Sequence, residues 1–92
     1  MIVRILGEGQ LDVGDLDMGP LNELDDKLQS AVELGDEEVF RSTLASMLDR
    51  VRQAGRPVPD ESLVPSDLVL PRPDADIEEV RALLGDEGLI PG

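Results

Sequence analysis

The chain lacks cysteine, histidine, tryptophan and tyrosine, and Phe40 is its only aromatic residue. Without cysteine there is no disulfide framework, no thiolate nucleophile and no cysteine-ligated zinc or iron–sulfur centre. Without histidine the chain also lacks the side chain that most often transfers protons near neutral pH and binds transition metals. These absences predict a protein that is not an enzyme and that uses no cofactor and no metal ion.

Basic residues are scarce as well, because 8 Lys+Arg stand against 21 Asp+Glu, which gives a formal net charge of −13. This charge has the wrong sign for nucleic acid, where Lys and Arg must displace counterions from phosphates. It also disfavours direct contact with anionic membranes, whose surface potential of roughly −30 mV repels acidic proteins. No apolar run approaches the ~20 residues that span a bilayer, and the N-terminus lacks the basic region of a signal peptide. We therefore expect no direct, unaided binding to a membrane, so that any membrane contact is indirect, through a partner.

The length and the hydrophobic content fit a single domain over residues 1–92. Hydrophobic residues make up 40% of the 92, and nearly all of them are Leu, Val, Ile and Ala. A chain of this length buries only about 60–65% of its unfolded surface, so we expect a modest aliphatic core. The order of the patterns predicts an α+β fold: a small N-terminal β-hairpin with a third short strand, an antiparallel αα-hairpin and a short C-terminal helix.

The N-terminal residues predict the β-hairpin. Among residues 2–6 only Arg4 is polar, which is the pattern of a strand buried on both faces or nearly so. The two glycines within residues 7–9 suit a tight reversal, and residues 10–13 alternate as a half-exposed return strand would. A third strand is expected at residues 66–70, where an apolar run bounded by prolines fits the edge of a sheet.

Two helices are expected after the hairpin. Pro20 suits the opening of the first helix, because an N–H is not needed there, and Gly35 is placed to end it. Asp36 is placed to cap the second helix, which stops at Gly55. Two apolar seams separated by one glycine predict an αα-hairpin whose seams pack against each other and the sheet, with the docking of a partner helix as the alternative. The seam residues are Leu21, Leu24, Leu28, Ala31, Phe40, Leu44, Met47 and Val51.

The charged residues of these helices are expected at the surface. The second helix and the residue just after Gly55 hold the only local cluster of bases, which consists of Arg41, Arg50, Arg52 and Arg56. The spacing of these arginines does not require all of them to share one face. The solvated face of the first helix is expected to carry Glu23, Asp25, Asp26, Lys27 and Glu33.

A last short helix is predicted near the C-terminus. Asp76, with Glu79 three residues later, resembles a capping box, and the helix is expected to run through Leu84. Its apolar face is expected to consist of Val80, Leu83 and Leu84. Beyond it, Leu89 and Ile90 either return to cap the core or form an exposed anchor.

Three segments of the sequence are distinctive: MIVRILGEGQ at residues 1–10, LVPSDLVLP at residues 63–71 and LLGDEGLIPG at residues 83–92. Together they resemble the PspAA family, small PspA-associated proteins of the phage-shock envelope-stress system, over essentially the whole chain. The resemblance implies a cytoplasmic accessory protein that acts with PspA, a long helical, ESCRT-III-like protein that polymerises on stressed inner membranes. It supplies no catalytic residues.

We therefore expect a non-enzymatic adaptor that binds PspA directly and tunes its assembly or its access to the membrane. PspA-like proteins meet anionic membranes through basic amphipathic segments, so an acidic partner would complement or mask that surface. The first candidate contact surface is the last helix and the tail, with Asp76, Glu78, Glu79, Asp86, Glu87, Leu89 and Ile90. The second is the set of bases Arg41, Arg50, Arg52 and Arg56.

Two other functions compete with this expectation. An acidic DNA mimic that binds another basic protein would present carboxylates in paired rows, whereas the acids here are spread over loops and caps. A structural oligomerisation module would bind copies of itself. Both candidate surfaces also have an ordinary interpretation as solvated charge, because most exposed charges contribute little to binding.

Overall fold

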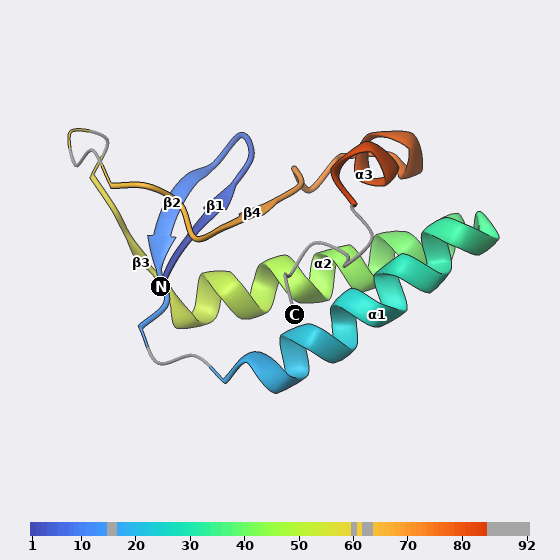
Figure 1. The fold of residues 1–92 in the computed structure, drawn as a ribbon, viewed down its shortest axis with the longest axis horizontal. Helices are drawn as coiled ribbons and strands as arrows, with labels where there is room; N and C mark the ends of the chain where they lie inside the picture. The colour runs from blue at the N-terminus through green and yellow to red at the C-terminus, as the bar shows by residue number, and fades with distance from the viewer. Residues whose placement is uncertain (15–16, 60, 62–63, 85–92) are drawn as a thin grey trace.

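A four-stranded sheet lies against a hairpin of two long helices in the described part of the chain (Figure 1). The computed structural model describes residues 1–14, 17–59, 61 and 64–84. The strands are β1 (Ile2–Ile5), β2 (Gly9–Asp12), β3 (Arg56–Pro57) and β4 (Leu68–Leu70), and the helices are α1 (Met18–Leu34), α2 (Glu37–Ala54) and α3 (Ile77–Leu83). This architecture confirms the predicted α+β fold, and β3 is a strand that the sequence did not predict.

Strand β1 lies between β2 and β4, in the sheet order β3-β2-β1-β4. It pairs antiparallel with β2, which puts Val3 beside Leu11, and parallel with β4, which puts Val3 beside Leu68. The predicted third strand is thus confirmed at the edge of the sheet, although it begins at Leu68, two residues later than expected. Just before it, Asp67 donates its N–H to the carbonyl of Ile2 (2.7 Å) and accepts on its carboxylate from the N–H of Ile2 (2.8 Å). A side chain therefore completes the pairing where β4 starts.

The opposite edge of the sheet is β3, which pairs antiparallel with β2 through Arg56 and Pro57. The sequence analysis predicted no strand at these residues. A proline is acceptable here because the outer side of an edge strand needs no N–H for pairing. The chain passes directly from α2 into β3 at Gly55, where a Cβ would lie 2.8 Å from the Cβ of Leu11. Only glycine permits this close approach of α2 to β2.

Strand β1 is buried on one face only, which corrects the prediction of a strand buried on both faces or nearly so. Val3 and Ile5 are 0% exposed, whereas Arg4 between them is exposed. The long helices cover one face of the sheet (Figure 1), so every second side chain of β1 points to the other face. There Gln10, the register partner of Arg4, donates from Nε2 to Oγ of Ser66 (2.8 Å). The outer face therefore carries polar contacts beside the exposed Val69, the register partner of Arg4 in β4.

The apolar seams predicted for α1 and α2 form most of the core. Every seam residue is buried except Leu24, which is half-buried. Gly35 adopts a left-handed conformation (φ 70°) and donates its N–H to the last turn of α1, which ends that helix. The side chain of Asp36 accepts from the N–H of Val39 (3.2 Å), which starts α2. These boundaries are as predicted. No helix of the described residues has the length and apolar character that a bilayer crossing needs.

The start of α1 differs from the prediction, because the helix begins at Met18 and not at Pro20. The side chain of Asp17 caps it by accepting from the N–H of Gly19 (3.0 Å). Pro20 is tolerated because the N–H groups of the first turn have no partner within a helix. The cap at Asp17 therefore sets the boundary, and the proline only follows it.

The predicted solvated face of α1 also needs one correction, because Asp25 is buried with 4% of its surface exposed. It lies four residues after Leu21 and three before Leu28, which places it on the same helix face as these core residues. Its charge predicted a position facing solvent, whereas the periodicity of the helix places it on the face that packs on the core. No buried side-chain nitrogen or oxygen among the described residues lacks a hydrogen-bond partner.

Helix α3 begins as predicted, since the side chain of Asp76 accepts from the N–H of Glu79 (2.8 Å). It ends at Leu83, with Leu84 as its cap, one residue earlier than expected. Leu83 is 42% exposed and does not belong to the apolar face, which corrects that prediction. At 100° per residue it lies well to one side of the stripe that packs on the core. That stripe consists of Ile77, Val80 and Leu84.

Replacement of Gly35 tests how much the left-handed turn between α1 and α2 stabilises the fold. We expect Gly35→Ala to lower the free energy of unfolding by about 1 kcal/mol, because a Cβ is disfavoured at positive φ. Gly35→Asn should cost less, since asparagine tolerates this conformation better. Urea denaturation followed by circular dichroism measures both. Equal losses for the two variants would contradict the conformational explanation.

Candidate partner-binding surfaces

The predicted acidic surface of α3 is present, and each of its three described carboxylates has a partner within the chain. Asp76 caps the helix. Glu78 accepts from Nη1 of Arg81 (3.0 Å), and Glu79 accepts from Nη2 of Arg72 (2.8 Å). These carboxylates remain accessible, because the side chains of Glu78 and Glu79 are 78% and 45% exposed. We call the three the α3 acids.

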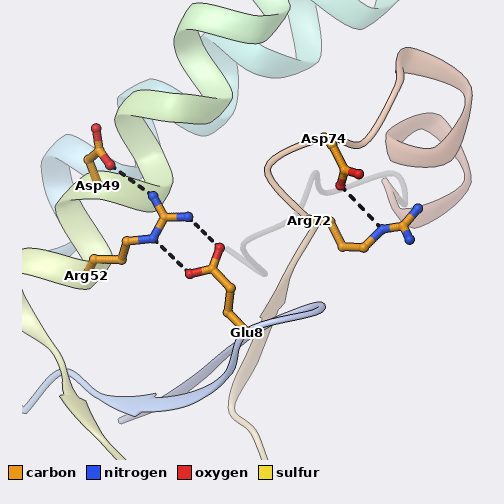
Figure 2. Close-up of polar contacts among 5 residues, drawn as sticks. All are labelled: Glu8, Asp49, Arg52, Arg72 and Asp74. Atoms are coloured by element: carbon orange, nitrogen blue, oxygen red, sulfur yellow. Dashed lines mark hydrogen bonds and ion pairs between the residues drawn. The ribbon is translucent and has the colours of Figure 1, made fainter.

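Arg72 and Arg81 connect α3 to neighbouring parts of the molecule. Arg81 also donates from Nη2 to the backbone carbonyl of Val32 near the end of α1 (3.0 Å). Arg72 forms a second ion pair with Asp74 (3.8 Å between Nε and Oδ1; Figure 2). The hydrogen bond from Arg72 to Glu79 raises the pKa of the Arg72 guanidinium. These contacts link α3 and its acids to the segment after β4 and to the end of α1.

The C-terminal part of the first candidate surface lies outside the described residues. It comprises Asp86, Glu87, Leu89 and Ile90. Their contribution to partner binding, and the docking or exposure of Leu89 and Ile90, remain predictions from the sequence.

The predicted basic cluster does not form one surface. Arg50 lines a groove between α1 and α2, whereas Arg52 contacts the turn of the β-hairpin. At 100° per residue these two arginines point to roughly opposite sides of α2, and Arg41 lies on the same side as Arg52. Arg56 lies on β3, at the edge of the sheet. The structure therefore brings none of these four arginines together as a patch.

Arg52 joins α2 to the β-hairpin in an arrangement that we call the Arg52 clasp. Its Nε donates to Oε1 of Glu8 (2.9 Å), its Nη2 donates to Oε2 of the same carboxylate, and its Nη1 donates to Oδ1 of Asp49 (3.0 Å) (Figure 2). The hydrogen bonds from Arg52 lower the pKa of Glu8 below its ordinary value of 4.5, against a weaker opposing effect of desolvation. Both side chains of the pair are 37% exposed, so water screens much of the attraction.

A groove of about 670 Å³ runs between α1 and α2, and the two helices alone line it. We call it the interhelical groove. Lys27 and Arg50 stand on opposite walls, one on each helix, and neither forms an ion pair with any described residue. The lining consists of Pro20, Glu23, Leu24, Lys27, Ser46, Asp49, Arg50 and Gln53.

The sequence analysis missed the Arg52 clasp and the interhelical groove. Glu8 and Arg52 are 44 residues apart, and no local pattern links a hairpin turn with the end of a distant helix. The ion pair of Glu78 and Arg81 could have been predicted from the sequence, because residues three apart in a helix are neighbours. The groove has no sequence signature, since it depends on how closely the two helices pack.

The Arg52 clasp predicts a pH-dependent contribution to stability. The folded state depresses the pKa of Glu8, so the contribution is complete above pH 4.5 and is lost as the pH falls through the lower pKa of the folded state. We expect Glu8→Gln to be less stable than Asp26→Asn, which removes the same charge at an exposed position, by about 0.5 kcal/mol at neutral pH. The difference should vanish at acidic pH. Urea denaturation across a pH series measures it, and a difference that does not change with pH would contradict an ionic origin.

Comparison with known proteins identifies the family of this chain. No curated protein and no solved structure matches the sequence. A family model described as PspAA, PspA-Associated protein, matches residues 1–92. The match spans all the segments on which the resemblance rested, together with both helices that form the interhelical groove. The chain therefore belongs to the PspAA family of PspA-associated proteins.

Proposed function

We propose that this protein is a non-enzymatic adaptor of the envelope-stress response that binds PspA and modulates its assembly or its association with the membrane. The observation that carries the proposal is the match of the entire chain to a family of PspA-associated proteins. The family description names an association, which is a binding function. The residues of this chain also fit binding better than catalysis, because the chain has no histidine and no cysteine.

The α3 acids supply the chemistry for this association. They lie on a chain with a net charge of −13, whose field attracts a basic surface and speeds the encounter with it. The family resemblance implies basic amphipathic segments on PspA, which is the complementary charge. By covering such segments, the protein would change how much of PspA reaches the membrane or assembles with further copies.

The exposure of the α3 acids favours recognition. Glu78 and Glu79 accept from Arg81 and Arg72 within the chain, and their side chains remain accessible to a partner. Exposed ion pairs are weak, so a basic residue of the partner can join or replace the guanidinium of Arg81 at Glu78 at little cost. We therefore place the first contact at α3.

Charge reversal on α3 tests this site. We expect Glu78→Lys to weaken the binding of the cognate PspA about tenfold, because it replaces attraction by repulsion at an exposed contact. Asp26→Lys is the matched control: it makes the same change of charge at an exposed position of α1 and should leave the affinity near that of the original protein. Isothermal titration calorimetry provides the affinities. An equal loss in both variants would place the effect in the net charge and contradict a contact at α3.

The ionic strength tests the electrostatic basis of the association. We expect the affinity for PspA to fall as NaCl rises from about 0.05 M to about 0.5 M, because salt screens exposed charges. Size-exclusion chromatography of the mixture at moderate salt tests the association itself, and separate elution of the two proteins would overturn the proposed function. Flotation of PspA with anionic liposomes, with and without this protein, then tells whether it promotes or reduces membrane binding.

A further inference from the structure

Two of the bases that this acidic protein leaves without an ion pair lie in the interhelical groove. Three of its 8 bases, Arg52, Arg72 and Arg81, are in ion pairs with acids of the chain. Arg4 donates a hydrogen bond to Ser66. The bases whose side chains form no ion pair and no hydrogen bond among the described residues are Lys27, Arg41, Arg50 and Arg56.

Lys27 and Arg50 remain unpaired although acids stand close to them in the sequence. Asp49 precedes Arg50 directly, but its carboxylate accepts from Arg52 (3.0 Å) and so belongs to the Arg52 clasp. Glu23 lies one turn before Lys27 on α1, yet no ion pair joins them. The groove lining therefore holds Lys27 and Arg50 beside the carboxylates of Glu23 and Asp49, and the two cations are available to pair with carboxylates of a partner.

The shape of the groove suits a helix. Its walls are residues 20–27 of α1 and 46–53 of α2, about two turns of each antiparallel helix, and a third helix packs naturally along such a channel. Leu24 offers a half-buried apolar contact that joins the core below. Ser46 donates its hydroxyl to the carbonyl of Ser42 (3.0 Å), so this small side chain needs no further partner and allows close approach.

We propose that the interhelical groove seats an amphipathic helix of PspA, with an apolar ridge on Leu24 and carboxylates on both flanks that pair with Lys27 and Arg50. This inference rests on the function proposed above and assigns it a second contact surface. The α3 acids require basic residues on the partner, whereas the groove requires acidic ones. A second copy of this chain is disfavoured as the occupant, because two bodies that each carry a charge of −13 repel each other.

The four unpaired bases provide a matched test. Lys27→Glu with Arg50→Glu reverses both groove cations, and Arg41→Glu with Arg56→Glu makes the same total change of charge outside the groove. We expect the groove double variant to bind PspA at least tenfold more weakly than the control double variant does. All four side chains are exposed, so circular dichroism should show both proteins folded. Equal affinities of the two double variants would overturn the groove proposal.

Lys27 is the only lysine of the chain, which permits a direct measurement. A carbodiimide joins an amine to a carboxylate that is already in contact with it. In the complex with PspA, we expect a crosslink from Lys27 to an acidic residue in a helical segment of PspA. A crosslink from Lys27 to a second copy, or only to its own chain, would overturn the proposal.

The outcomes separate this inference from the proposed function. If the original protein and PspA do not associate at all, the proposed function fails and the groove assignment fails with it. If they associate, and the groove double variant and the control bind equally well, the groove assignment alone fails. Loss of binding confined to the groove double variant, with a crosslink at Lys27, supports both.

Discussion

The burial of the α1 and α2 seams against one face of the sheet is the interaction on which the whole structure depends. Phe40, Leu44 and Met47 of α2 are at most 1% exposed and share one core with Val3 and Ile5 of β1. Each such side chain contributes about 1.5–3 kcal/mol relative to its exposed state. An exposed ion pair contributes about 0–1 kcal/mol. The aliphatic core therefore fixes the positions of the helices and the sheet, which together form the frame of the molecule. The surface charges add smaller contributions to this frame.

Three of the bases connect elements of that frame. Arg52 joins α2 to the hairpin turn, Arg72 joins the segment after β4 to α3, and Arg81 joins α3 to the end of α1. Helix α3 has one fully buried residue, Val80, and a helix of 7 residues is not stable alone. Its position therefore depends on these contacts more than the position of α1 or α2 does. Each connection also reduces the repulsion among 21 acids.

The two proposals together assign opposite charge requirements to two surfaces of this frame. The α3 acids present exposed carboxylates at one end of the molecule, and the interhelical groove presents Lys27 and Arg50 from two facing walls. A partner that satisfies both must itself place basic and acidic residues at a fixed separation. Recognition of this kind is selective, because a partner that carries only one sign of charge meets repulsion at one of the two surfaces.

The sequence by itself determined the elements whose causes are local. The caps at Asp36 and Asp76, the glycine turn at Gly35 and the apolar seams follow from residues within a few positions of one another. The acidic α3 surface was also predictable, because its carboxylates belong to one short helix. The family resemblance followed from the two ends of the chain and the segment at residues 63–71.

Only the tertiary structure decided the features that join distant segments. Which face of β1 is buried depends on where the helices lie, and β3 exists because Gly55 lets the chain pass close to Leu11. The clasp between Glu8 and Arg52 spans 44 residues, and the interhelical groove arises from the packing of two helices. Local patterns encode the periodicity and the caps of single elements, whereas contacts between elements depend on three-dimensional packing, which no short stretch of sequence contains.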